Sequence, residues 1–222
     1  GTMTDLFVSA LPPGDGPRDA AVPFLAILLI AGHDTGMVMY SRALHLLAHD
    51  PALAARLRRE LEDAGATAAR PLQAEALDRL PALDRTMLEI GRLYPSVVNL
   101  PRVATEDIEA GGFRVTRGTR VAVAVAGMHR RPDIHADPHR FDPERFADPN
   151  SARLTRPFLN LTFSGGARLC LGMRLAQIEF KAIVSRALLR YSLEPRDRAP
   201  VAHGGYWIAR PSGPMVVSLG RR

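Results

Sequence analysis

The stretch FSGGARLCLG, residues Phe163–Gly172, contains the only cysteine of the 222-residue chain, Cys170. The neighbouring Gly165 and Gly166 permit backbone conformations and close approaches that a Cβ atom would block. The cysteine stands about where a long helical pattern begins, and the free N–H groups and peptide dipoles of a helix start favour a thiolate. The thiol is therefore either a buried, inert side chain or a metal ligand that its surroundings keep deprotonated.

Two further side chains of this stretch favour a metal ligand. Arg168 adds positive charge two residues before the thiol, and Phe163 can shield one side of the sulfur from water. A thiolate that donates into iron and lies against a flat macrocycle needs these residue types, whereas a structural cysteine needs none of them. Zinc is disfavoured because no second cysteine exists and no histidine lies within four residues. A thiol nucleophile stays open, although no paired histidine is evident.

The bulk composition is that of an ordinary soluble globular protein, large enough for one large domain or two small ones. Because there is one cysteine, no disulfide can form within the chain, which fits a reducing, cytoplasmic setting. The net charge of +6 comes almost wholly from arginine, Lys181 being the single lysine, and it is spread along the chain. No arginine-rich run is interleaved with aromatic residues. We therefore expect no nucleic-acid binding and expect the basic surface to dock an acidic protein partner.

No membrane segment is expected either. The longest apolar run, Ala20–Gly32, is shorter than the ~20 residues that a spanning helix needs. Acidic residues, in place of the basic region of a signal peptide, precede this run: Asp5, Asp15 and Asp19. The run is therefore interpreted as part of a helix of a soluble protein.

The periodicity of the chain predicts a mainly helical protein with a small antiparallel β region. Residues 1–18, rich in proline and glycine, are expected to form a flexible arm. Helical patterns follow, the second of them capped by Asp50, at Asp19–His49, Pro51–Gly65, Pro81–Tyr94 and Met173–Tyr191. Alternating apolar and polar residues predict short antiparallel strands over 102–127 and a last strand at Met215–Leu219. Residues 129–150, dense in proline and charge, are expected to be irregular but structured.

Two other patterns place polar side chains inside predicted helices. Glu89 and Arg92, at i and i+3, share one helix face, and such a pair alone is usually a surface salt bridge worth about 0–1 kcal/mol.

In AGHDT, Ala31–Thr35, the threonine hydroxyl can bond back to a carbonyl one turn earlier. With Gly32 alongside, the helix can instead open there to admit a ligand or water. The last two side chains of the motif then become a proton-delivery pair.

One other loop could hold a metal, because imidazole and carboxylate side chains crowd it: His129, Asp133, His135, Asp137 and His139. Roles in forming turns and capping helices are a simpler explanation for these residues than a metal site. A metal in this loop is therefore not favoured.

Four stretches together resemble the motifs of the cytochrome P450 family, and they follow the order of that family. FSGGARLCLG is similar to its heme loop, Phe-x-x-Gly-x-x-x-Cys-x-Gly, at Phe163, Gly166, Cys170 and Gly172. LEIGRLYP looks like its Glu-x-x-Arg helix motif, and FDPERF, Phe141–Phe146, like its meander segment. AGHDT is similar to the oxygen-activating motif of its long central helix.

The resemblance implies the C-terminal, heme-bearing half of the cytochrome P450 fold over residues 19–222, with heme b (iron protoporphyrin IX) as the cofactor. It implies that Cys170 ligates the iron, and that the other cofactor-binding residues are Ala31, Gly32, Arg102, His129, Phe163, Gly166, Arg168 and Gly172. Among these, the candidate partners of the heme propionates are Arg102, Arg168 and His129, with a solvated loop residue as the alternative for His129. Asp34 and Thr35 are implied as the catalytic pair. Arg145 would join Glu89 and Arg92 in a buried structural network.

For function, the resemblance implies a heme-thiolate monooxygenase of the soluble, bacterial type that oxidises a small-molecule substrate. Electrons are expected from a separate ferredoxin or flavoprotein, since the sequence holds no flavin or nicotinamide motif. Two alternatives stay open. One is a truncated heme-binding module or subunit without its own monooxygenase activity, and the other is a heme enzyme that uses peroxide or needs no redox partner.

The sequence departs from the family in length, because it corresponds only to about the C-terminal half of a usual member. The segments that cap the distal heme face in the family would precede this sequence. An apolar central helix without those neighbours exposes a patch that invites pairing with another chain. We therefore expect a homodimer, or a complementary chain, to cover the central helix.

Overall fold

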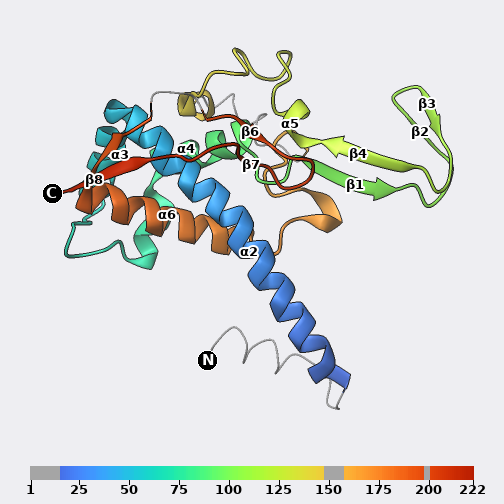
Figure 1. Ribbon diagram of the computed structural model, residues 1–222, viewed down its shortest axis with the longest axis horizontal. Coiled ribbons are helices and arrows are strands. Elements are labelled where there is room, and N and C mark those ends of the chain that lie inside the picture. The colour runs from blue at the N-terminus through green and yellow to red at the C-terminus, as the bar shows by residue number, and fades with distance from the viewer. Residues whose placement is uncertain (1–15, 148–157, 198–200) are drawn as a thin grey trace.

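Figure 1 shows a computed structural model of the protein, in which residues 16–147, 158–197 and 201–222 are described. The helices are α2 (Gly16–His49), α3 (Pro51–Asp63), α4 (Pro81–Leu93), α5 (Val125–Met128) and α6 (Met173–Arg190), with the 3-10 turns η1 (Ala74–Arg79), η2 (Pro143–Phe146) and η4 (Gly166–Arg168). The strands are β1 (Asn99–Val103), β2 (Ile108–Ala110), β3 (Phe113–Val115), β4 (Arg120–Ala124), β5 (Tyr191–Pro195), β6 (His203–Gly204), β7 (Arg210–Pro211) and β8 (Val217–Arg221). The predicted fold class, mainly helical with a small antiparallel β region, is confirmed.

The ends of α3 follow local signals in the sequence. Oδ1 of Asp50 accepts the backbone N–H of Leu53 at 2.9 Å, which satisfies one of the free donors at the helix start. The helix ends at Asp63, and Gly65 then adopts a φ of +84°. A residue with a Cβ atom would be strained in that conformation, so glycine is the residue that stops this helix.

The start of α2 differs from the sequence pattern. The helix begins at Gly16 and not at Asp19, so residues 16–18 of the expected arm are helical. Residues 1–15, the remainder of that arm, lie outside the described residues. The proline at position 17 falls in the first turn of this helix, where its missing N–H breaks no helical hydrogen bond.

The last strand is displaced toward the C-terminus relative to its prediction. It runs over Val217–Arg221 because it pairs antiparallel with β5, from Pro195 opposite Val217 to Tyr191 opposite Arg221. Pairing with a partner strand, and not the local apolar pattern, therefore sets its length.

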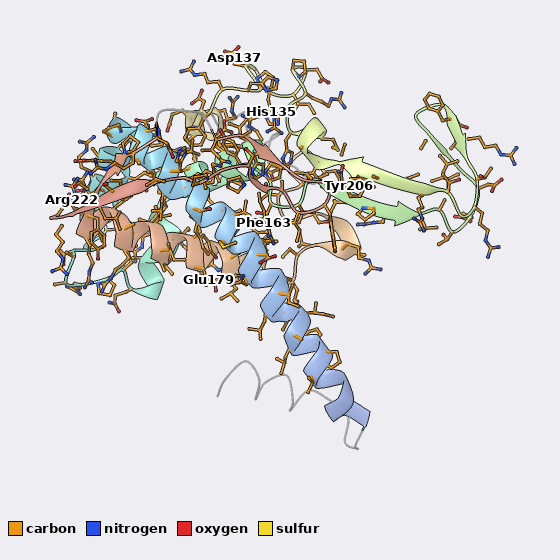
Figure 2. All side chains as sticks on the ribbon, in the orientation of Figure 1. His135, Asp137, Phe163, Glu179, Tyr206 and Arg222 are labelled. Atoms are coloured by element: carbon orange, nitrogen blue, oxygen red, sulfur yellow. The ribbon has the colours of Figure 1, made fainter. Side chains whose placement is uncertain are left out.

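The core forms where α3, α4 and α6 meet the C-terminal half of α2. Its fully buried members include Ala43, Leu47, Leu57, Leu61, Leu83, Ile90, Phe180 and Val184. A hydrogen bond of 2.7 Å from the hydroxyl of Tyr40 to Oε2 of Glu179 also joins α2 to α6. Glu179 is labelled in Figure 2. Burying each large aliphatic or aromatic side chain contributes roughly 1.5–3 kcal/mol, so this cluster carries most of the stability.

The N-terminal half of α2 projects away from this core (Figure 1). Its apolar side chains are largely exposed, among them Val22 (71%), Ile27 (63%), Leu29 (74%) and Ile30 (66%). By length and composition alone, the segment Val22–His49 is long and apolar enough to cross a membrane, with a mean hydropathy of 1.6 in its most apolar window. The prediction had considered only the shorter run Ala20–Gly32. The core helices of soluble proteins can be equally long and apolar, and the second half of α2 is packed against the rest of the protein.

The strands of the described residues form two-stranded antiparallel sheets, in the pairs β1–β4, β2–β3, β5–β8 and β6–β7. The hairpin β2–β3 turns at Gly111 and Gly112, whose φ angles of +59° and +80° explain why glycine stands there. An antiparallel bridge between Val97 and Ile208 ties the C-terminal part of the chain to the segment that follows α4. The bridge therefore joins two segments that lie far apart in the sequence.

Candidate heme site

The cysteine loop is closed by its own backbone. The N–H of Cys170 donates to the carbonyl of Phe163 at 2.9 Å, and the N–H of Leu169 donates to the carbonyl of Gly166 at 3.1 Å. Gly166 has a φ of +61°, a conformation that favours glycine. The thiol itself is exposed. The interpretation as a buried, inert cysteine is therefore wrong.

The loop leads directly into α6. The N–H of Met173, the first helical residue, donates to the carbonyl of Cys170 at 3.3 Å, and Gly172 forms the N-cap. A Cβ atom on Gly172 would lie 4.0 Å from Sγ of Cys170, so glycine leaves one flank of the sulfur open. The thiol thus stands beside a helix start, where the helix dipole favours negative charge.

Phe163 anchors the loop to the helical core. It is half-buried and packs against the hydrophobic cluster, in the position labelled in Figure 2. The predicted role of Phe163 in shielding the sulfur stays a prediction. Three leucines close to Cys170 in the sequence are exposed: Leu169 (51%), Leu171 (80%) and Leu175 (47%).

Glu89, Arg92 and Arg145 meet in one buried network, as the sequence predicted. Nε and Nη2 of Arg92 donate to the two carboxylate oxygens of Glu89 at 2.7 and 2.8 Å. Nε of Arg145, from η2, donates to Oε1 of Glu89 at 2.9 Å. The side chains of Glu89, Arg92 and Arg145 are 0%, 1% and 8% exposed. A surface salt bridge, the alternative for the helical pair, is therefore excluded.

The same guanidinium groups organise the irregular segment between β4 and η2. Arg92 donates to the carbonyls of His129 and Pro138 at 2.8 and 2.7 Å. Arg145 donates to the carbonyl of Ala136 at 2.8 Å. The network therefore supplies the hydrogen bonds that this proline-rich segment does not make with a neighbouring strand.

His129 does not have the role that was predicted for it. Its side chain is fully buried, with Nε2 accepting the N–H of Leu161 at 2.8 Å and Nδ1 lying 3.2 Å from the carbonyl of Arg92. Burial lowers the pKa of His129 to about 4, so the ring is neutral at pH 7. Neither a propionate partner nor a solvated loop residue fits this environment. His129 instead holds the irregular segment before the cysteine loop against the end of α4.

Arg102 and Arg168 are both exposed, so their guanidinium groups are open to a charged ligand. Arg102 lies on β1, where its Nη1 donates to the carbonyl of Pro101 at 2.8 Å. Arg168 ends η4, two residues before the thiol. A heme-thiolate site needs a thiolate, an apolar surface against the ring and cations for the propionates. An exposed thiol with an open flank, the leucines around it and these two guanidinium groups fit that requirement.

In the AGHDT motif of α2, the hydroxyl of Thr35 donates to the carbonyl of Ala31 at 2.6 Å. The carbonyl of Thr35 in turn accepts a bond of 2.9 Å from the hydroxyl of Ser96. The side-chain hydroxyl of Thr35 therefore makes the local hydrogen bond expected for a threonine in a helix. At Gly32 the helix surface is open, because an added Cβ would meet nothing within 4 Å.

Asp34 is bound from two sides. Nδ1 of His33 lies 3.1 Å from Oδ1 of Asp34, and Nη2 of Arg210 donates to Oδ2 at 2.5 Å. The bond from His33 and the charge of Arg210 lower the pKa of Asp34, whereas partial desolvation acts against them. The sequence reasoning missed Arg210 and Ser96. No local signal marks either residue, because both come from distant parts of the chain.

The histidine-rich loop, the rival metal site, does not bring its side chains together. Asp133 pairs with Arg131, and the ring of His129 is used in backbone contacts. Within the described parts of the chain, no three ligand atoms of this loop lie close enough to hold an ion.

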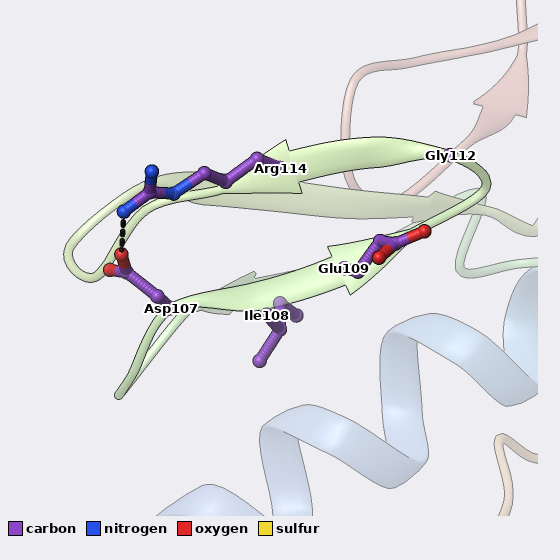
Figure 3. A pocket seen from close by; sticks show the side chains of 5 residues that line it. All are labelled: Asp107, Ile108, Glu109, Gly112 and Arg114. Atoms are coloured by element: carbon purple, nitrogen blue, oxygen red, sulfur yellow. Dashed lines mark hydrogen bonds and ion pairs between the residues drawn. The ribbon is translucent and has the colours of Figure 1, made fainter.

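A shallow hollow on the hairpin β2–β3 also lacks a thiol or imidazole (Figure 3). It is lined by Asp107, Ile108, Glu109, Gly112 and Arg114.

Comparison with known proteins identifies the family. The profile of the Cytochrome P450 family matches residues 19–217. Human Cytochrome P450 4V2 is 34% identical over 195 residues, which cover 87% of this chain and 37% of that protein. Putative cytochrome P450 120 of the cyanobacterium Synechocystis is 34% identical over 75% of this chain and 37% of its own length.

A solved structure agrees with the sequence relatives. Retinoic acid bound cyanobacterial CYP120A1 superposes with a TM-score of 0.84 at 30% identity, covering 95% of this chain and 48% of its own. The fold and the site therefore define a cytochrome P450 scaffold. This chain belongs to the cytochrome P450 family, and it spans somewhat more than a third of the length of the curated relatives it matches. Because those relatives are both mammalian and cyanobacterial, the soluble, bacterial type stays a prediction.

Proposed function

We propose that this chain provides the heme-bearing half of a heme-thiolate monooxygenase that oxidises a small organic molecule. The observation that supports it most strongly is the exposed thiol of Cys170, held beside the start of α6 by a loop that its own backbone closes. Family membership supports the cofactor class, and heme b is the form we propose.

In this proposal, Cys170 supplies the iron ligand and the leucines beside it face the ring. Arg102 and Arg168 carry exposed guanidinium groups that pair with the propionates. When bound, the heme supplies oxygen activation, which the electron donation of a thiolate ligand favours. The buried network around Glu89 keeps the supporting surface rigid.

Asp34 and Thr35 are proposed as the groups that move protons to the reacting centre. Asp34 is held ionised by His33 and Arg210, and it can accept a proton from solvent at the exposed helix surface. The hydroxyl of Thr35 can pass on a proton when it turns away from the carbonyl of Ala31. Replacing Thr35 with Ala should uncouple oxygen consumption from product formation, whereas unchanged coupling would contradict this role.

The electron donor is proposed to be a separate ferredoxin or flavoprotein, in a cytoplasmic setting. The net charge of +6 supports an acidic partner, because opposite charges steer the encounter. Electron transfer from an acidic ferredoxin should therefore slow as salt is raised. A salt-independent rate would contradict docking through the basic surface.

The exposed apolar half of α2 is proposed to be covered by a complementary chain or by a second copy of this chain. The largely exposed Ile27, Leu29 and Ile30 support this, because contiguous apolar surface favours association. Analytical ultracentrifugation of the heme-loaded protein, with and without a candidate complementary chain, measures it. A stable monomer that binds no such chain would contradict the proposal.

The central experiment is the absorption spectrum of the reduced, carbon monoxide-treated protein. A Soret band at the thiolate position supports the proposal, and Cys170→Ser should abolish that band. Ala167→Ser places the same new side chain in the same exposed loop, so it should leave the band unchanged. A band typical of nitrogen ligation, or no heme uptake by the unaltered chain, would contradict the proposal and favour a module without its own activity. Product formation with peroxide but not with a ferredoxin system would instead favour a peroxide-using enzyme.

A further inference from the structure

The C-terminal end of α2 brings two imidazoles and a carboxylate to one point. His45 and His49, at i and i+4, share a helix face, and Asp197 follows β5. Nε2 of His45 lies 3.0 Å from Oδ1 of Asp197, and Nε2 of His49 lies 3.5 Å from the same oxygen. One ligand atom from each of the three residues lies within 4.8 Å of the others. None of these side chains belongs to the proposed heme site.

Each ring nitrogen of His49 faces a backbone carbonyl. Its Nδ1 lies 2.9 Å from the carbonyl of His45, and its Nε2 lies 3.1 Å from the carbonyl of Asp197. Both neighbours are hydrogen-bond acceptors, but a neutral imidazole has only one N–H. If Nδ1 donates to the carbonyl of His45, a lone pair on Nε2 faces oxygen atoms. In that tautomer, Nε2 offers its lone pair to a cation.

The arrangement has the tautomer and the spacing of a metal site. An Nδ1–H that donates to a backbone carbonyl is the usual way in which a protein orients a histidine that binds metal through Nε2. Two ligand atoms that are each ~2.0–2.1 Å from a tetrahedral zinc ion lie roughly 3.3–3.4 Å apart. The distances of 3.0 and 3.5 Å from the Nε2 atoms to Oδ1 of Asp197 bracket that value. A small shift of Asp197 would therefore suffice to admit the ion.

His45 and Asp197 are positioned by the surrounding structure. His45 is 5% exposed, and its Nδ1 has no hydrogen-bond partner among the described residues, so its tautomer is not fixed by a second bond. Oδ2 of Asp197 accepts the N–H of Val216 at 3.0 Å, and this leaves Oδ1 directed to the histidines. The side chains of His49 and Asp197 are 33% and 22% exposed, so water can supply a fourth ligand.

We propose that His45, His49 and Asp197 bind a divalent transition-metal ion of the zinc class. Two imidazole nitrogens and one carboxylate oxygen suit such an ion, whereas calcium and magnesium prefer oxygen ligands alone. The ion joins the end of α2 to the segment between β5 and β8, which lie beside that end of the helix (Figure 1). Its role is structural: it fixes the C-terminal sheet to the central helix.

Zinc titration of the EDTA-treated full chain tests this proposal, with calorimetry and thermal unfolding as readouts. We expect one equivalent to bind, and at a hundredfold excess over Kd we expect Tm to rise by about 5–10 °C. Magnesium should give no shift. His49→Gln and Asp197→Asn should each abolish the shift, and Asn retains an oxygen for the N–H of Val216. His139→Gln, which removes an exposed histidine elsewhere, is the matched control and should bind as the unaltered chain does.

Because the thiol of Cys170 is also a zinc ligand, each titration is repeated in the Cys170→Ser background. Binding and stabilisation that persist there, but are lost with His49→Gln, support the site. Zinc binding that disappears with Cys170→Ser alone places the ion at the thiol and overturns the proposal. The proposal is also overturned if the unaltered chain binds no zinc, or if the His49→Gln and Asp197→Asn variants bind zinc as tightly as the unaltered chain. The cluster would then be held together by hydrogen bonds alone.

Discussion

Nη2 of Arg210 donates a hydrogen bond of 2.5 Å to Oδ2 of Asp34, and 176 positions of sequence separate the two residues. The contact joins β7 to the central helix α2, at the motif proposed to deliver protons. The C-terminal segment therefore fixes the position and the charge of a proposed catalytic group. Arg210 itself is a positioning residue, because it acts through Asp34.

Replacing Arg210 with Gln should raise the pKa of Asp34. The pKa of Asp34 is lowered by the bond from His33 and by the charge of Arg210, so the loss of the charge removes part of the effect. NMR titration of the Asp34 carboxyl carbon measures this change. Arg114→Gln, which breaks an exposed pair with Asp107, is the control and should leave Asp34 unchanged. An unshifted Asp34 in the Arg210 variant would show that the bond has no electrostatic effect.

Replacing Glu89 with Gln should cost about 3–5 kcal/mol of unfolding free energy, because two buried guanidinium groups lose their counter-charge. Urea unfolding of the heme-free chain measures this loss. Asp133→Asn removes one partner of the exposed pair with Arg131 and should cost only about 0–1 kcal/mol. Equal costs for the two variants would mean that the network around Glu89 is not buried in solution.

His129 should make the stability depend on pH between about 6.5 and about 4. Its pKa falls from 6.5 to about 4 in the folded state because of burial, so the unfolded chain binds a proton more readily. The contribution of His129 is therefore fully present above pH 6.5, and it is lost as the pH falls toward 4. It amounts to roughly 3 kcal/mol.

Urea unfolding at a series of pH values checks this contribution. His129→Gln should flatten the dependence in that window, since its amide oxygen can still accept the N–H of Leu161. His139→Gln, at an exposed site, should retain the dependence. If the dependence of the His129 variant equals that of the unaltered chain, His129 is not the group responsible.

Gly91→Ala should destabilise the contact between α4 and the residue before the cysteine loop. An added Cβ would lie 2.5 Å from Cγ2 and 2.6 Å from Oγ1 of Thr162, so the two elements would have to separate. We expect a loss of about 1–3 kcal/mol and weaker heme loading. Gly127→Ala, whose Cβ would meet only Ala124 at 3.6 Å, is the control. Adding Thr162→Ala should restore part of the stability, and no restoration would contradict this explanation.

Much of the fold could be predicted because its signals are local. The cap at Asp50 and the glycine that ends α3 act within one turn of the helix, so the sequence alone places both boundaries. The glycine-rich cysteine loop is likewise read from adjacent residues. The pairing of Glu89 with Arg92 follows from their spacing on one helix, although their complete burial does not.

Other features could not be predicted from the sequence, because they depend on contacts between elements that are far apart in the chain. His129 was assigned to a propionate or to solvent, and packing instead buries it against Leu161 and the end of α4. The extent of β8 depends on its pairing with β5. No periodicity in the chain encodes such contacts, since they are set by the register in which the elements pack.

By itself, the sequence determined the class of fold, the ends of α3 and the lone thiol on its glycine loop, because backbone sterics and helix capping act between near neighbours. Only the tertiary structure decided that Arg210 meets Asp34, that His129 is neutral, and that His45, His49 and Asp197 converge. Those arrangements depend on burial and on distances between segments far apart in the chain, and these are fixed only when the core has packed.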